Sequence, residues 1–478
     1  MKQRLTLLIC ALLVLLDLAA TFVQYSRMVL DGDLAAIVWP APSYAPVLHD
    51  PFGWAVLTRD AVYAAPNRFF AHISQVGYYR AVPGWLQGLG VPPIDSLYAA
   101  QALFATLVQA GLFYVLATYI VGSGRPGNWR LWLAMALLAP FFQAQGYAGE
   151  MAIVPQATSY AFAYPLPLLL LLGLLRPFWQ WAGGRPWRLS GLGVAGWLGL
   201  AVVLAFNGPV VPGVVAVLLL GAGLHWLRTA GPPAGWPTRL RQLPRTPLLL
   251  LAALGLLCAY SLYIGRNNAE NLWQPLSVAA RYQRLPLGVV KQLTGKLGMP
   301  LLVLLCLANA YLLRRWATPS PDNQRLRAVL RAVGWFALGY VLLLPLGGYR
   351  SYRPYLLRFD SILPITLGLL LFYGLSALYL LRHLPGRARS GYAVAVVVVA
   401  FIYANADRKL RVPDGNDGER AALVQLAQAP PAQAVVSLAA PVNVLSWKVF
   451  TRPEESATNA AMLDYWHVTQ GPKLYYHP

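Results

Sequence analysis

The residues of this chain best suited to chemistry are acidic side chains that follow its first hydrophobic segment. Residues 31–72 come soon after an apolar run at 5–25, and they hold four of the 17 acidic residues: Asp31, Asp33, Asp50 and Asp60. A well-placed carboxylate can take a proton from a hydroxyl group, which is general base catalysis. This concentration of carboxylates predicts a reaction centre at one face of a membrane.

The spacing of Asp31 and Asp33 separates their expected roles. At positions i and i+2 they share a face only on an extended backbone, because in a helix they diverge by about 200°. Residues 34–37 indicate the start of a helix, so we expect Asp31 to be a cap and Asp33 to be the reactive carboxylate. In the alternative interpretation both aspartates only cap a short interfacial helix, a position that Asp favours.

Glu150 is a further candidate acid outside the predicted membrane spans, and it lies in a short segment at 145–156. Together with Asp31 and Asp33 it would supply the oxygen ligands that Mg²⁺ or Mn²⁺ prefers, although no spacing requires a metal. A solvated loop carboxylate is the alternative. No other cofactor is indicated.

Basic and aromatic residues gather at 347–360: Tyr349, Arg350, Tyr352, Arg353, Tyr355 and Arg358. Arginine can bind phosphate through two parallel N–H groups, and aromatic faces suit sugar or prenyl contacts. Anchoring in lipid headgroups is the alternative. Further candidates for substrate contacts lie in the segment after the first span: Tyr63, Asn67, Arg68 and His72.

Composition predicts an all-α polytopic membrane protein, since 58% of residues are hydrophobic, only 12% are charged and the mean hydropathy is +0.51. Apolar runs long enough for a bilayer predict eleven transmembrane helices. They fall at residues 5–25, 96–121, 129–144, 157–175, 189–206, 209–227, 246–264, 298–316, 328–346, 361–382 and 390–406. A cleaved signal peptide is the alternative for the first run, although Asp17 interrupts it.

The distribution of basic residues predicts the orientation. With the N-terminus in the cytoplasm, the short inside segments carry 19 of the 38 basic residues, as expected for cytoplasmic loops. The net charge of +21 is therefore mostly topological, and we expect no nucleic-acid partner. We expect a multi-pass protein of a bacterial inner membrane, with an extracytoplasmic C-terminus.

Two domains are expected. Residues 1–406 form the membrane domain, whose long first outer loop is 26–95, and residues 407–478 form a small extracytoplasmic α/β domain. Within the second domain, the pattern predicts a helix at 419–428, a strand at 434–438 and a helix at 454–465.

This plan resembles the GT-C superfamily of integral membrane glycosyltransferases, which use sugars linked to polyprenyl phosphate. At residue level the resemblance rests on Asp31-Gly32-Asp33, on 358–364 (RFDSILP), similar to an Arg-aromatic-x-x-Pro type signature, and on 60–66 (DAVYAAP). It implies a fold of about eleven spans with extracytoplasmic loops. It also implies that Asp33 is the base with Asp31 as alternate, that Glu150 orients the acceptor or binds a metal, and that Arg358 holds the lipid phosphate.

The expected function is thus transfer of a sugar from a polyprenyl-phosphate donor to a hydroxyl of a glycan or lipid acceptor, on the extracytoplasmic face of the lipid bilayer. Arg350 and Arg353 would assist Arg358, and Tyr352 would contact substrate. Two alternatives remain open. One is a transporter or flippase of a lipid-linked glycan, and the other is a non-catalytic membrane assembly subunit.

Overall fold

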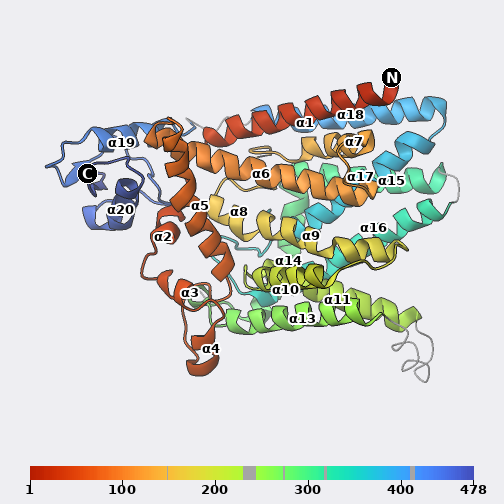
Figure 1. The fold of residues 1–478 in the computed structure, drawn as a ribbon, viewed down its shortest axis with the longest axis horizontal. Coiled ribbons are helices and arrows are strands. Elements are labelled where there is room, and N and C mark those ends of the chain that lie inside the picture. Colours follow the sequence, from red (N-terminus) through yellow and green to blue (C-terminus); the bar gives the residue numbers. More distant parts are fainter. Residues whose placement is uncertain (148, 230–243, 273–274, 317–319, 410–414) are drawn as a thin grey trace.

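Long helices lying side by side make up most of the molecule, and a small α/β unit covers one end of them (Figure 1). This computed structural model describes residues 1–147, 149–229, 244–272, 275–316, 320–409 and 415–478. The N-terminus lies at the end of the bundle opposite the α/β unit, which contains the C-terminus (Figure 1).

Nine helical segments among the described residues are long and apolar enough to cross a membrane. They are α1 (Lys2–Ser26), α6 (Pro93–Val121), α8 with α9 (Thr158–Ala163 and Pro165–Ala182), α11 (Val210–Thr229), α13 (Arg245–Gly265), α15 (Gly298–Arg315), α16 with η4 (Pro321–Leu343 and Leu344–Gly347), α17 (Leu363–His383) and α18 (Gly386–Lys409). The structure thus agrees with a helical membrane protein.

The other two predicted spans coincide with shorter apolar helices. These are α7 (Trp129–Leu138), which continues as the 3-10 turn η1 (Ala139–Phe141), and α10 (Gly191–Ala205). Pro140 lacks a backbone N–H, which favours the change of helix type at that point. Whether α7 and α10 also cross the membrane, and hence the total of eleven, stays a prediction.

Local signals set several helix ends. Asn128 and Ser320 precede α7 and α16, and their side chains accept hydrogen bonds from backbone N–H groups of the first turn at 3.1 Å. The last residue of α6 is followed by Gly122 with φ of 73°, a left-handed conformation that glycine adopts without strain. Apolar runs between such signals become the long helices.

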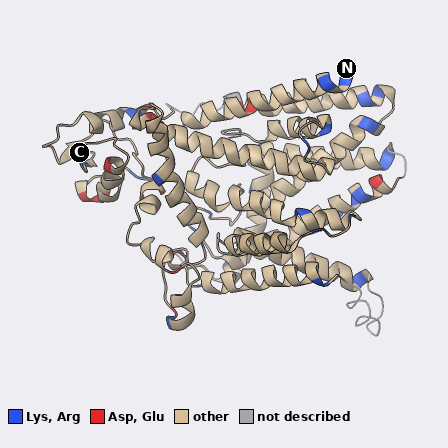
Figure 2. Ribbon diagram, viewed as in Figure 1, with Lys and Arg blue, Asp and Glu red and all other residues tan. Residues whose placement is uncertain are grey.

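Charged residues divide between the two ends of the bundle. Figure 2 shows lysines and arginines gathered at the end where the N-terminus lies, and acidic residues mostly at the other end. Basic residues of the first end include Lys2 and Arg4 at the start of α1, Arg185 just after α9, Arg325 near the start of α16 and Arg382 at the end of α17. We call it the basic end, and positive charge favours the cytoplasmic side. The orientation itself stays a prediction.

The predicted first outer loop folds into short helices at the end opposite the basic end (Figure 1). They are α2 (Leu34–Val38), α3 (Ala45–His49), α4 (Trp54–Arg59) and the longer α5 (Phe69–Gly88). The segment between α13 and α15 contains the 3-10 turn η3 (Ala269–Asn271) and α14 (Val278–Thr294). These elements surround the site described below.

The C-terminal unit has the predicted elements and one more. It consists of α19 (Asp417–Gln428), β1 (Val435–Ser437), η5 (Pro453–Ser456), α20 (Ala457–Tyr465) and β2 (Leu474–Tyr476). The strand β2, which the sequence pattern did not indicate, pairs in parallel with β1. The predicted domain boundary at 407 falls within α18, because that helix continues to Lys409.

Buried polar contacts hold the C-terminal unit against the first loop. The Trp466 indole N–H donates to the Tyr79 carbonyl at 2.9 Å. The Glu419 carboxylate accepts from the Leu30 backbone N–H at 2.8 Å and from the Tyr98 hydroxyl at 2.9 Å. Glu419 is only 3% exposed, so these partners satisfy a carboxylate that would otherwise be costly to bury.

Candidate functional site

Asp31 lies five residues beyond α1, and each oxygen of its carboxylate accepts a hydrogen bond from a backbone N–H. One oxygen accepts from the Asp33 N–H at 2.9 Å and the other from the Ser159 N–H at 2.5 Å. Ser159 is in the first turn of α8, so Asp31 caps that helix rather than the helix that follows it in sequence. Asp31 therefore has the expected capping role, but Ser159, which it binds, lies 128 residues further along the chain.

Asp33 precedes α2, and its side chain makes no capping hydrogen bond there. Burial, together with repulsion from Asp31, raises the pKa of Asp33 to about 7, while the Trp447 side chain and the charge of Arg68 act in the opposite direction. A carboxyl with such a pKa is poised to exchange a proton near neutral pH. Of the two aspartates, Asp33 has the carboxylate left for chemistry.

Gly32 allows the C-terminal unit to pack closely against the segment that holds Asp31 and Asp33. A Cβ atom at Gly32 would lie 2.6 Å from the backbone nitrogen of Trp447 and 2.8 Å from its ring, which real Cβ atoms do not tolerate. The Trp447 side chain is 58% exposed although it touches the motif. An exposed indole thus stands beside Asp33, contributed by a distant part of the chain.

Glu150 lies elsewhere, at the start of α15. Gln292 donates to one of its carboxylate oxygens at 3.3 Å, and a Cβ atom at Gly298 would lie 3.2 Å from the other. Burial raises the pKa of Glu150 to about 7. Among the residues described, no group of three or more His, Cys, Asp or Glu side chains is placed to hold a metal, so Asp31, Asp33 and Glu150 are not brought together for that purpose.

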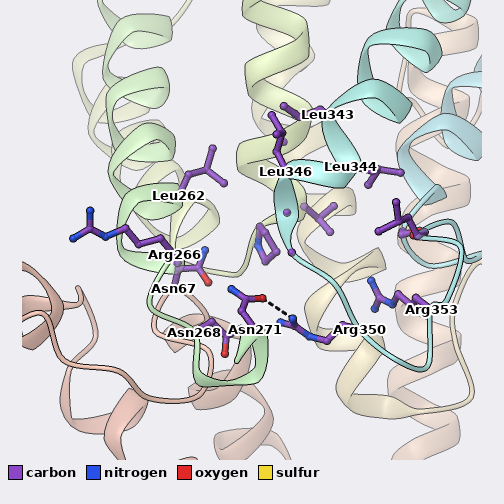
Figure 3. Close-up of a pocket in the computed structure, with 18 of the residues that line it drawn as sticks. Asn67, Leu262, Arg266, Asn268, Asn271, Leu343, Leu344, Leu346, Arg350 and Arg353 are labelled. Carbon is purple, nitrogen blue, oxygen red and sulfur yellow. Dashed lines mark hydrogen bonds between the residues drawn. The ribbon is translucent and has the colours of Figure 1, made fainter. Parts of the chain in front are cut away.

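A pocket of about 390 Å³ opens among α11, α13, α16 and the loop at 347–361 (Figure 3). Figure 3 shows leucines of α13, α16 and η4 at one end and polar side chains at the other. The lining includes Leu262, Leu343, Leu344 and Leu346 at the apolar end, and Asn67, Asn268, Asn271, Arg350 and Arg353 at the polar end. This polarity suits a molecule with an apolar tail and an anionic head.

The structure brings together most of the predicted binding residues here. Arg350, Arg353, Asn67, Arg68 and Tyr352 all line the pocket. Tyr63, His72 and Arg358 do not. Tyr63 donates its hydroxyl to Asp50 at 2.8 Å, outside the pocket.

His72 has a packing role in this structure. It is 4% exposed and its ring lies 5.3 Å from that of Tyr44. Burial, with the nearby charge of Arg68, lowers the pKa of His72 to about 3. The imidazole is therefore neutral at physiological pH, and it would not serve as a cation for phosphate.

The three predicted arginines differ in how far their donors are already used. Arg350 is paired with Glu270 at 3.0 Å and donates to Asn271 at 2.5 Å (Figure 3). Arg353 donates to Asp360 at 2.9 Å, and its Nε is buried without a partner among the described residues. Arg353 thus keeps one unpaired donor, which is buried, while most donors of Arg350 are engaged.

Arg358 is bound bidentately by Asp360. Its Nε donates to one carboxylate oxygen at 2.9 Å and its Nη2 to the other. The guanidinium also lies over the rings of Tyr160 and Tyr352, at 4.8 and 5.0 Å. The family-like signature at 358–364 therefore builds a tight arginine–carboxylate pair beside the pocket.

Asp360 links two arginines from a fully buried position, with its side chain 0% exposed. Burial opposes ionisation, but Arg353 and Arg358 outweigh it and lower the pKa of Asp360. We expect Asp360→Asn to destabilise the protein by about 3–5 kcal/mol, the typical effect of leaving a buried charge without its partner. Thermal unfolding of the purified protein in detergent measures this loss.

Asp60→Asn is the matched control, because Asp60 also pairs with an arginine, Arg266, but at 75% side-chain exposure. Exposed ion pairs contribute little, so this variant should unfold at nearly the wild-type temperature. Equal unfolding temperatures for Asp360→Asn and Asp60→Asn would mean that the buried pair does not stabilise the loop.

Arg68 is the least occupied cation of the site. In the described part of the chain, no hydrogen bond or ion pair holds its guanidinium, although it lines the pocket. Its charge acts on Asp33 and, with Arg350, lowers the pKa of Glu270 against the effect of burial. Arg68 therefore stands within electrostatic reach of both the candidate base and the polar end of the pocket.

Several residues of this site gave no distinctive sequence signal. The Tyr164 hydroxyl accepts a hydrogen bond from Nη2 of Arg353 at 2.6 Å, and Glu270 neutralises Arg350. Glu270 was not among the predicted site residues. Trp447 lies in the C-terminal unit and was not among the predicted site residues either. No known protein-family model matches this chain, and neither does any curated protein.

Proposed function

We propose that this protein transfers a sugar from a polyprenyl-phosphate donor to an acceptor hydroxyl, at the end of the bundle opposite its basic end. The observation that carries the proposal is the placement of Arg68. This cation lies between the raised-pKa carboxylate of Asp33 and a pocket with an apolar end among helices and a polar end outside them. A lipid phosphate has the chemistry to fill such a pocket.

Asp33, Arg68 and Arg353 have separate roles in the proposed transfer. The carboxylate of Asp33 takes the proton from the acceptor hydroxyl as its oxygen forms the new glycosidic bond. The bond between the sugar carbon and the phosphate oxygen breaks, and its electron pair leaves with the polyprenyl phosphate. The guanidinium groups of Arg68 and Arg353, two residues that line the pocket, stabilise the charge that develops on that phosphate.

This proposal gives Arg358 a positioning role rather than the first contact with phosphate. Its donors engage Asp360, and Asp360 in turn holds Arg353 against the pocket. Arg350 is partly neutralised by Glu270, and it would contribute weaker attraction. The fold proposed with this function is of the GT-C type, with the C-terminal unit outside the cytoplasm.

The enzyme assay follows the leaving group, so the acceptor need not be known. Purified protein in liposomes, supplied with a radiolabelled polyprenyl-phosphate sugar and total membrane glycans or lipids as acceptors, should release polyprenyl phosphate. A nucleotide sugar should give none. Movement of the intact donor across the bilayer without cleavage would instead identify a flippase, and binding without either event would identify an assembly subunit.

The rate of transfer should depend on pH in the direction set by Asp33. Because the base acts as a carboxylate and its pKa is raised to about 7, activity should fall as the pH is lowered through that value. One unit below a pKa, only about a tenth of the carboxyl groups are ionised. Initial rates one unit below this pKa should therefore be about tenfold lower than the constant rate reached well above it.

Glu150→Gln is the control for the pH profile, because the pKa of Glu150 is also raised to about 7 but the residue lies apart from Asp33. The transfer rate of this variant should still fall as the pH is lowered. If the rate of Glu150→Gln no longer falls at low pH, the group whose titration controls activity is Glu150 and not Asp33.

A further inference from the structure

A second pocket, of about 350 Å³, lies at the basic end of the bundle, far along the helices from Asp33. Its walls are the last turns of α6, α9 and α17 and the first turns of α16. It therefore lies between the packed pair α6 and α9 and the packed pair α16 and α17. The proposed transfer reaction uses none of its residues.

Three arginines and one histidine border this pocket: Arg185, Arg325, Arg382 and His383. The single acidic residue of its lining is Asp322. Within the ranges the structure describes, no ion pair or side-chain hydrogen bond engages any of the three arginines. Their N–H donors are thus available to an anion from outside the chain.

Two glycines leave space for these guanidinium groups. A Cβ atom at Gly183 would lie 2.9 Å from Nη2 of Arg325, and one at Gly122 would lie 3.2 Å from Nη2 of Arg185. Any larger residue at either position would displace the arginine. The backbone therefore accommodates two cations at the edge of one pocket.

Helix dipoles account for only part of this cluster of arginines. Arginine near a helix C-terminus interacts favourably with the dipole, which accounts for Arg382 at the end of α17. Arg325 lies in the opposite situation, at the fifth residue of α16, where the helix end already carries partial positive charge. An anion in the pocket would be attracted by both the helix end and Arg325.

The rest of the lining is aromatic and aliphatic. The guanidinium carbon of Arg325 lies 5.5 Å from the ring centroid of Trp179, and Trp179 packs on Tyr119 at 5.4 Å. Leu326, Val329 and Leu375 add apolar surface. A lining that combines cations with apolar surface matches a phosphate esterified to a glycerol that carries acyl chains.

We propose that this pocket binds the phosphate of an anionic phospholipid headgroup, with Arg325 and Arg382 as its main ligands. Basic pockets between transmembrane helices at the cytoplasmic side suit such headgroups, and the surrounding membrane is the nearest source of phosphate. The bound lipid would join the α6–α9 pair to the α16–α17 pair.

Native mass spectrometry of the purified full chain in detergent tests the proposal. Phosphatidylglycerol should bind more tightly than phosphatidylcholine with the same acyl chains. Arg325→Gln and Arg382→Gln should each weaken phosphatidylglycerol binding about tenfold, the usual effect of losing a charged hydrogen bond. Arg387→Gln is the control, because Arg387 is an exposed arginine of α18 that does not line the pocket.

Competition by inorganic phosphate distinguishes two possible ligands that carry the same charged group, a lipid phosphate and a soluble phosphate compound. If millimolar phosphate leaves phosphatidylglycerol bound, the lipid is the ligand. If it displaces the lipid from the wild type but has no effect on the residual binding in Arg325→Gln, the phosphate site stands and a soluble phosphate compound fills it. Equal binding of both lipids, or equal losses in Arg325→Gln and Arg387→Gln, would overturn the proposal.

Discussion

Asp33→Asn should reduce sugar transfer by about 10²–10⁴-fold, the usual contribution of a general base, while protein yield and folding stay near normal. The amide has almost the shape of the carboxylate, but it cannot accept the proton of the acceptor hydroxyl. Folding should not suffer, because the ionised Asp33 is disfavoured by burial and by Asp31. Release of polyprenyl phosphate from liposomes measures the loss.

Asp31→Asn is the informative comparison, because the two aspartates are two residues apart but differ in their contacts. Asp31 holds the first turn of α8 through Ser159, so its loss should lower the unfolding temperature as well as activity. Full transfer by Asp33→Asn, together with an inactive but normally stable Asp31→Asn, would move the role of base to Asp31.

Arg68→Ala should weaken binding of polyprenyl phosphate by about 1.5–3 kcal/mol, the typical contribution of a hydrogen bond to a charged group. Its guanidinium has no hydrogen-bond or ion-pair partner among the described residues, but its charge favours the ionised form of buried Glu270, so a loss of stability should accompany the loss of binding. Arg68→Lys should restore part of the binding, because the charge remains without the planar fork. Titration of the purified variants with a polyprenyl phosphate in detergent measures each affinity.

Two controls separate Arg68 from other arginines of the region. Arg266 also lines the pocket, but it is paired with exposed Asp60, so Arg266→Ala should bind nearly as the wild type does. Arg358→Ala should mainly lower the unfolding temperature, since it leaves Asp360 with one arginine fewer. Unchanged affinity in both Arg68 variants, with a large loss in Arg358→Ala at normal stability, would return the phosphate to Arg358.

The positions of the helices followed from local sequence. A long apolar run between capping residues, glycines and prolines becomes a helix whatever surrounds it, because its backbone hydrogen bonds close within the segment. For this reason the predicted runs at 246–264 and 361–382 differ from α13 and α17 by only one or two residues at each end. The shortest runs remained ambiguous, since length alone does not place α7 and α10 across a membrane.

The sequence by itself determined the class of the protein, most of the long helices and the segments that carry candidate chemistry, because these depend on composition and on neighbours along the chain. Only the tertiary structure decided which charges are free. Arg350 is paired with Glu270, 80 residues away, and Asp31 binds Ser159, 128 residues away, whereas Arg68 has no such partner among the residues described. Availability of a charged group depends on what faces it in space, and no pattern along the chain encodes those pairings.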